Sequence, residues 1–176
     1  MEFHRAADVL GMANLAQLVN ALGMINTSDT DMVDSPIYSA FQLYRDHALG
    51  LAVNSQITAD TYDNAPLGNI PSLHGVPYLD ASATVDTEKK QATLIVVNRH
   101  YDRPIAARID LRNMPGGKAQ FQLDAWEMNG SGPNDRNTFE ERHRVRIETK
   151  PSGQVSPSFV YSFPPHSATA LVLRGH

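Results

Sequence analysis

A group of carboxylates between positions 124 and 141 has the residue types needed for acid–base chemistry. Glu140 and Glu141 are adjacent, and Asp124 and Glu127 precede them in the same region. Two carboxyl groups can share general acid and base work only when both face the same substrate. Neighbouring side chains of a strand point to opposite faces, so Glu140 and Glu141 would not face each other across a substrate. We therefore interpret this pair as solvated loop charge.

The histidines show none of the spacings typical of a metal site, such as HxH or HExxH. His100 lies two residues before Asp102 in a turn, which favours local hydrogen bonding. Ser167 follows His166, but no G-x-S-x-G elbow accompanies it, so we interpret His166 as a residue that fixes the entry to the last strand. The seven histidines are His4, His47, His74, His100, His143, His166 and His176.

Composition excludes several classes of partner. The chain has 176 residues and a net charge of −4, so a clustered basic surface for nucleic acid or anionic membranes is not expected. No apolar run approaches the roughly 18 residues of a membrane span. There is no cysteine, which excludes disulfides and thiolate metal sites, and we expect no metal or cofactor. The amino-terminal residues do not resemble a signal peptide, so the cytoplasm is the favoured location.

The carboxylates and histidines must be positioned by strands. In the stretch Lys90–Arg112, two strand-like runs, Ala92–Val97 and Ile105–Leu111, are separated by a short polar segment. The second run alternates apolar and polar residues, and the first is apolar on both sides, as in a central strand. Pro104 limits where the second run can begin, because proline has no N–H to donate. We predict that the two runs form an antiparallel hairpin.

Turn signals about every ten residues separate the further strands, a pattern typical of a β-sandwich or barrel. Residues 59–75 are rich in proline and glycine and are predicted to be a wrapping loop. One strand would place Phe121, Leu123 and Ala125 in a single apolar row. With the two runs above, about eight strands are expected; the others are Leu51–Thr58, Val76–Asp86, Lys118–Met128, His143–Thr149, Ser158–Phe163 and Ser167–Arg174.

The first fifty residues have a different character. Ser35 is a suitable N-cap with Pro36 at the first helical position, and Gly50 is a natural stop, which predicts a helix over Ser35–Ala48. Its apolar stripe would consist of Ile37, Phe41, Tyr44 and Ala48. For residues 6–27 a helix and a buried strand followed by a turn remain equally possible. We therefore expect an α/β piece over 1–50 and a β domain over 51–176.

These segments resemble the carboxy-terminal part of family 51 glycoside hydrolases, the α-L-arabinofuranosidases. The resemblance implies a jelly-roll-like antiparallel β-sandwich, preceded by a short α/β remnant of a (β/α)8 barrel. Asp8–Gln17 would be the last barrel strand and Ser35–Ala48 the last barrel helix. The matching blocks are MANLAQLVNALGMINT, SPIYSAFQLYRDH, VPYLDASAT, LIVVNRHYDRPIAARIDL, NTFE and FPPHSATAL.

The family resemblance also implies where the chemistry lies. Family members use two glutamates, an acid/base after an Asn-Glu pair and a nucleophile on a later barrel strand, and this chain contains no Asn-Glu dipeptide. We therefore expect the chain alone to be inactive and its parent to release terminal arabinofuranosyl groups from arabinan or arabinoxylan. Gln17 matches a family glutamine that contacts the arabinose ring, and it would do so only within a full barrel.

Two alternatives come from other functional classes. A free-standing carbohydrate-binding module would bind an arabinose-containing polysaccharide, although Trp126 is the single tryptophan available for stacking. A small glycoside hydrolase would need a carboxylate site of its own, built from residues such as Glu127, Glu140 or His143. For the accessory fragment, we expect self-association through Ile37, Phe41 and Tyr44, or through an open strand edge.

Overall fold

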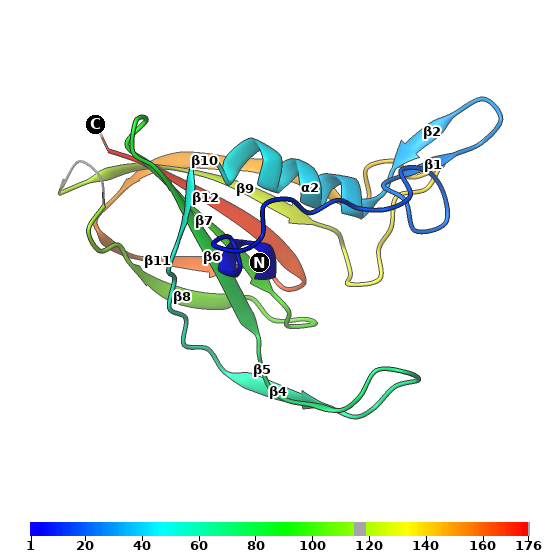
Figure 1. Cartoon of the computed structure of the whole chain (residues 1–176), viewed down its shortest axis with the longest axis horizontal. Helices are drawn as coiled ribbons and strands as arrows, with labels where there is room; N and C mark the ends of the chain where they lie inside the picture. The colour runs from blue at the N-terminus through cyan, green and yellow to red at the C-terminus, as the bar shows by residue number, and fades with distance from the viewer. Residues whose placement is uncertain (115–118, 176) are drawn as a thin grey trace.

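A six-stranded antiparallel sheet forms the body of the protein, in a computed structural model that describes residues 1–114 and 119–175. The spatial order is β10-β9-β12-β7-β6-β3 (Figure 1). β12 lies between β7 and β9, and its residues Ala170 to Leu173 are fully buried because both faces of the sheet are covered. The strands are β3 (Leu51–Val53), β6 (Leu79–Asp86), β7 (Gln91–Asn98), β9 (Phe121–Asn129), β10 (Arg146–Val155) and β12 (Ser167–Arg174).

A second, smaller sheet covers one face of the first and completes the sandwich. It consists of β8 (Ile105–Asp110) and β11 (Ser158–Phe163), paired antiparallel. Phe121 and Phe163 are almost fully buried in the core between the sheets. The predicted mainly β, antiparallel sandwich is therefore confirmed. The predicted strand bounds hold for β11 and β12, whereas β3 stops at Val53 and β10 runs from Arg146 to Val155. Lys118 and His176 lie outside the described residues.

The predicted hairpin between the two runs of Lys90–Arg112 is wrong. β7 pairs with β6 and β12, whereas β8 pairs with β11 in the other sheet. The chain changes sheets between β7 and β8, and Asn98 holds this corner. Its Nδ2 donates to the carbonyl oxygens of Arg103, Phe163 and Pro164 at 3.1, 3.1 and 2.9 Å. These bonds tie the end of β7 to the segment before β8 and to the end of β11.

The predicted helix is confirmed as α2 (Pro36–His47), with Ser35 at its N-cap position. It covers the outer face of the six-stranded sheet (Figure 1). The predicted apolar stripe is only partly correct. Leu43 is fully buried and Tyr44 packs beside it, while Ile37 and Phe41 are each 41% exposed. The sheet receives the Leu43 side of the helix, on which Ser39 is also buried.

The segment before α2 does not form the predicted barrel strand over Asp8–Gln17, nor the alternative helix within residues 6–27. It contains α1 (Glu2–Arg5), irregular chain, and the short pair β1 (Ile25–Thr27) and β2 (Met32–Asp34). A barrel strand needs hydrogen-bonded neighbours on both sides, and the described residues provide none here. No helix among them is long and apolar enough to cross a membrane.

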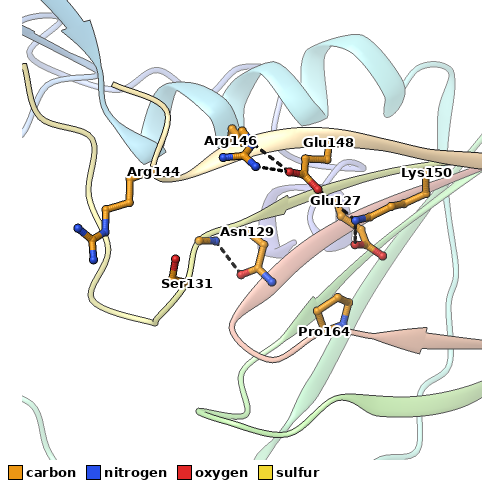
Figure 2. A pocket seen from close by; sticks show the side chains of 9 residues that line it. Glu127, Asn129, Ser131, Arg144, Arg146, Glu148, Lys150 and Pro164 are labelled. Carbon is orange, nitrogen blue, oxygen red and sulfur yellow. Dashed lines mark hydrogen bonds and ion pairs between the residues drawn. The ribbon is translucent and has the colours of Figure 1, made fainter. Parts of the chain in front are cut away.

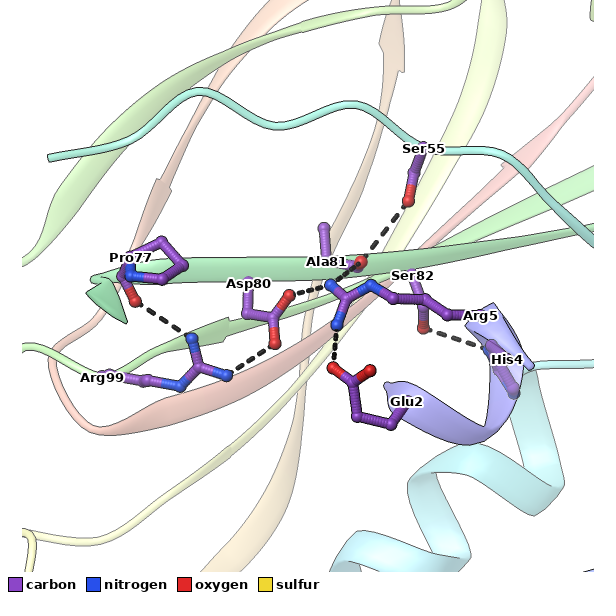
Figure 3. Close-up of polar contacts among 9 residues, drawn as sticks. All are labelled: Glu2, His4, Arg5, Ser55, Pro77, Asp80, Ala81, Ser82 and Arg99. Atoms are coloured by element: carbon purple, nitrogen blue, oxygen red, sulfur yellow. Dashed lines mark hydrogen bonds and ion pairs between the residues drawn. The ribbon is translucent and has the colours of Figure 1, made fainter. Parts of the chain in front are cut away.

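A charge cluster attaches α1 to the outer face of β6 (Figure 3). Asp80 is 4% exposed and is held between two guanidinium groups, those of Arg5 and of Arg99, the latter at 2.6 Å. Burial disfavours the charged carboxylate, but the hydrogen bonds from both arginines outweigh this effect and keep the pKa of Asp80 below its ordinary value. His4 adds a contact of 3.0 Å between its Nδ1 and Ser82 Oγ.

The stretch predicted to be a wrapping loop, residues 59–75, instead contains most of a hairpin arm. β4 (Thr61–Asn64) and β5 (Leu73–Pro77) pair with each other and project from the body (Figure 1). The proline and glycine residues of the tip are typical of a loop, and for this reason the short strands on either side of the tip were not predicted. The arm is fixed at its base by ring contacts of Tyr78 with Tyr62 and with His100, at centroid distances of 4.8 and 4.6 Å.

Candidate functional site

A polar cleft of about 300 Å³ lies at one end of the sandwich, where β9 and β10 meet the turn between β11 and β12 (Figure 2). Its walls come from the ends of β9 and β10 and from the loop that joins them. The lining residues are Glu127, Asn129, Gly130, Ser131, Arg144, Arg146, Glu148, Lys150 and Pro164.

Glu127 reaches the cleft from the core side of β9. It continues the inward row of Phe121, Leu123 and Ala125, and it is 8% exposed. Tyr161 Oη on β11 donates to Glu127 Oε1 at 2.9 Å, and Lys150 Nζ lies 2.9 Å from Oε2. Burial, together with the neighbouring carboxylate, raises the pKa of Tyr161, and the hydrogen bond to Glu127 raises the pKa of Lys150.

A second carboxylate stands directly across from Glu127, since Glu148 on β10 is its partner in the strand register. Lys150 Nζ lies 3.3 Å from Glu148 Oε2, so one ammonium contacts both carboxylates. Hydrogen bonds from Arg146 and Lys150 hold the pKa of Glu148 below its ordinary value. A general acid needs a raised pKa, so this carboxyl is unsuited to protonate a leaving group. The arrangement favours hydrogen bonding over bond cleavage.

The remaining predicted carboxylates do not join Glu127. Asp124 points to the other face of β9, where it pairs with Arg174 and accepts from Ser152. Glu140 and Glu141 are exposed in the loop before β10, and Glu141 pairs with Arg144 at 2.5 Å. Their interpretation as loop charges is confirmed. His143 is also exposed and does not line the cleft.

The other predicted residues have local roles. His100 Nδ1 lies 3.2 Å from Asp102 Oδ1, as the turn interpretation expected. His166 stands in the turn before β12, with its Nδ1 2.9 Å from Asn129 Oδ1. Gln17 is exposed on irregular chain, with a left-handed φ of 61°, and lies outside the cleft. Among the described residues, no group of three or more histidine, aspartate or glutamate side chains could hold a metal ion.

Sequence reasoning missed Asn129, Glu148 and Lys150 as parts of one site. One signal was available for Glu127 and Asn129, because both continue the alternate row that buries Phe121 and Ala125. A carboxylate in a core row must be paired or face water. Glu148 and Lys150 carried no such signal, because their position depends on the register of β10 with β9.

The fold defines the class of this protein as an antiparallel β-sandwich with a polar cleft at one end. The chain belongs to the family described as "Alpha-L-arabinofuranosidase C-terminal domain", whose model matches residues 1–167. The predicted relationship to family 51 is therefore confirmed. The chain spans about a third of the length of these curated relatives.

Individual relatives support the same relationship. "Alpha-L-arabinofuranosidase C" of Emericella nidulans is 26% identical over 170 residues, covering 96% of this chain and 31% of the relative. An α-L-arabinofuranosidase structure from Thermotoga maritima, an arabinose complex, superposes with a TM-score of 0.84 at 28% identity, covering 97% of this chain and 35% of that one. The GH51 enzyme of Thermotoga petrophila gives a TM-score of 0.83 at 28% identity.

Proposed function

We propose that this chain is the accessory β-sandwich of an α-L-arabinofuranosidase and performs no bond cleavage itself. The parent enzyme would release terminal arabinofuranosyl groups from arabinan or arabinoxylan. Both catalytic glutamates would lie in the two thirds of the relatives that this chain does not match. The observation that carries the proposal is the family match over residues 1–167 combined with coverage of 31 to 35% of the relatives.

Exposed apolar side chains in the amino-terminal part favour the idea that another part of the parent enzyme covers this surface. Val9, Met12 and Leu22 are 82, 76 and 76% exposed, and Ile37 and Phe41 of α2 add to the exposed apolar side chains. Such surface is normally buried against another body. We propose that residues 1–50 connect the sandwich to a barrel and that residues 51–176 form the sandwich proper. The opposite side of α2 is already buried on the sheet, so α2 would be held from both sides.

Gln17 belongs to this proposal. In a full barrel its amide would orient a hydroxyl group of the arabinose ring, a role that a neutral amide can fulfil by donating and accepting hydrogen bonds. In the isolated chain Gln17 is exposed and lies outside the cleft, so its side chain does not contribute to a sugar-binding site.

A chimera tests the function. This chain would replace the matching carboxy-terminal third of the Thermotoga maritima relative, and hydrolysis of p-nitrophenyl α-L-arabinofuranoside would be measured. We expect activity in the chimera, none in this chain alone, and none in the relative truncated without a replacement. Turnover by the purified chain that disappears in Glu127→Gln would overturn the proposal and favour a hydrolase with its own site.

A further inference from the structure

We propose that the polar cleft at the end of the sandwich is a binding site for a neutral saccharide. The inference rests on the proposed function, because it assumes a parent that acts on arabinose-containing chains. The site uses donors and acceptors of Asn129, Ser131 and Glu148, and its charged walls remain in their existing pairs.

Free hydrogen-bonding groups project into the cleft. Asn129 Oδ1 is occupied by the backbone N–H of Gly130 at 2.9 Å and faces His166 Nδ1, which leaves its Nδ2 as a donor without a partner among the described residues. Ser131 donates its backbone N–H to Asp135 Oδ2 at 2.6 Å, and its hydroxyl group, which can donate and accept, has no hydrogen-bond partner among the described residues. Figure 2 shows Asn129 between Ser131 and the Glu127–Lys150 pair.

The side-chain amide of Asn129 is held in place before a ligand arrives. Its Oδ1 contacts on two sides fix the plane of the amide, so the direction of Nδ2 is set by the fold. A preorganised donor loses little conformational freedom on binding, which favours affinity for small polar ligands. Adjacent hydroxyl groups of a sugar present the alternating donors and acceptors that such a group requires.

The charges of the cleft select against an ionic ligand. Arg144 is paired with Asp135 at 2.8 Å and with Glu141, and Arg146 is paired with Glu148 at 2.6 Å. Lys150 contacts both Glu127 and Glu148. An anionic sugar would meet cations that are already paired with carboxylates, whereas a hydroxyl group can add a hydrogen bond to a paired carboxylate oxygen. The lining therefore fits a neutral polyol.

The shape of the cleft also suits a sugar. A volume of about 300 Å³ is at the small end of the range for ligand sites, enough for one or two pentose rings. Pro164 contributes an apolar ring to the lining (Figure 2), against which the C–H groups of a sugar ring can pack. Because the cleft opens at the end of the sandwich, a longer chain could extend beyond it.

The test is titration of the isotope-labelled chain with an arabino-oligosaccharide, followed by backbone amide NMR. We expect saturable shifts at Asn129 to Ser131 and at the start of β10, from Arg146 to Lys150, with a Kd on the order of 1 mM. Asn129→Ala combined with Ser131→Ala should weaken binding about tenfold through lost hydrogen bonds. The matched control is Asn54→Ala with Ser72→Ala, which makes the same changes at exposed positions outside the cleft.

Three outcomes would overturn the inference. They are the absence of saturable shifts, equal affinity in the cleft variant and the control variant, and tighter binding of a galacturonate oligosaccharide than of the neutral one. The spectrum of each variant outside the cleft reports whether it is folded. An active chimera with a cleft that binds no saccharide would remove this inference alone and leave the accessory role intact.

Discussion

The hydroxyl group of Tyr161 on β11 donates a hydrogen bond to the buried carboxylate of Glu127 on β9, and this 2.9 Å contact joins the two sheets. It lies where the apolar row of the core ends and the cleft begins. Tyr161 also packs its ring against Phe163, at a centroid distance of 5.0 Å. One residue thus closes the core and orients the deepest carboxylate of the cleft.

Removing this hydroxyl group should weaken the sandwich. Tyr161→Phe keeps the ring but leaves Glu127 with Lys150 as its remaining partner, and we expect a loss of about 2 kcal/mol in the free energy of unfolding. Urea denaturation measures this quantity. Tyr101→Phe removes a hydroxyl group from a side chain that is 66% exposed and should change stability little. Equal stability of the two variants would show that the bond between the sheets contributes nothing.

The same contact predicts an effect of alkaline pH. The folded-state pKa of Tyr161 is raised above its unfolded value of 10.0, chiefly by burial and further by Glu127. A group with a raised folded pKa stabilises the protein fully below its unfolded pKa and loses this contribution as pH rises through the folded value. Stability should therefore fall above pH 10 in the wild-type chain and fall less in Tyr161→Phe. Parallel curves for both proteins would contradict the assignment.

Asp80 predicts an effect at the acidic end. Its folded-state pKa is lowered, so its contribution is present above the unfolded pKa of 3.8 and is lost as pH falls through the folded value. Asp80→Asn should cost about 2 kcal/mol at neutral pH, because two arginines lose their charged partner, and should flatten the acid limb of the stability curve. Exposed Asp102→Asn is the comparison. An unchanged acid limb in Asp80→Asn would assign acid sensitivity to other carboxylates.

The single tryptophan reports on the helix that covers the sheet. His47 of α2 stacks on Trp126, with ring centroids 4.0 Å apart. Burial, with a smaller contribution from Arg174, lowers the pKa of His47 below 6.5, although Asp46 opposes this. Because a protonated imidazole quenches indole fluorescence, we expect emission to fall on acidification with a midpoint below pH 6.5. His47→Gln should remove the titration. A titration that persists in His47→Gln would mean that another group reports on Trp126.

Self-association is expected through the exposed side of α2. Ile37 and Phe41 are one helical turn apart and each 41% exposed, whereas Tyr44, predicted to join them, packs toward the sheet. Light scattering should show a mass that rises with concentration, and Ile37→Ser with Phe41→Ser should lower it. Leu43→Ala serves as the contrast, because it empties a buried position and should destabilise the fold by about 3 kcal/mol. A monodisperse wild-type monomer would exclude this contact.

The strands of the two packed sheets were predictable, except for their exact bounds, and their partners were not. Alternation of apolar and polar residues marks β8, and the continuous apolar run marks β7, since both patterns follow from which faces are buried. Neither pattern says which strand lies alongside. The change of sheet between them depends on Asn98, whose amide bonds to a carbonyl oxygen 66 residues away in sequence. A single polar residue at the end of an apolar run gave no indication of that distant partner.

The helix was predictable from its local signals, and its orientation was not. Ser35 and Pro36 define where α2 begins independently of the rest of the chain. Which side faces the sheet depends on the surface that receives it, here Ile95 and Ala170 with Trp126 nearby. The helix carries apolar residues on two sides, so its sequence pattern does not indicate whether it packs against a barrel or against a sheet. The cleft was hidden for a related reason, because Glu148 reaches Glu127 only through the pairing of β10 with β9.

The hairpin arm has a consequence for how this domain can vary. Within the described part of the chain, β4 and β5 pair only with each other, and Leu67 at the tip is 75% exposed. Since the two sheets do not depend on it for pairing, the tip can be lengthened, shortened or exchanged at little thermodynamic cost. It is therefore a modular position, at which a guest peptide could be inserted while the sandwich continues to fold.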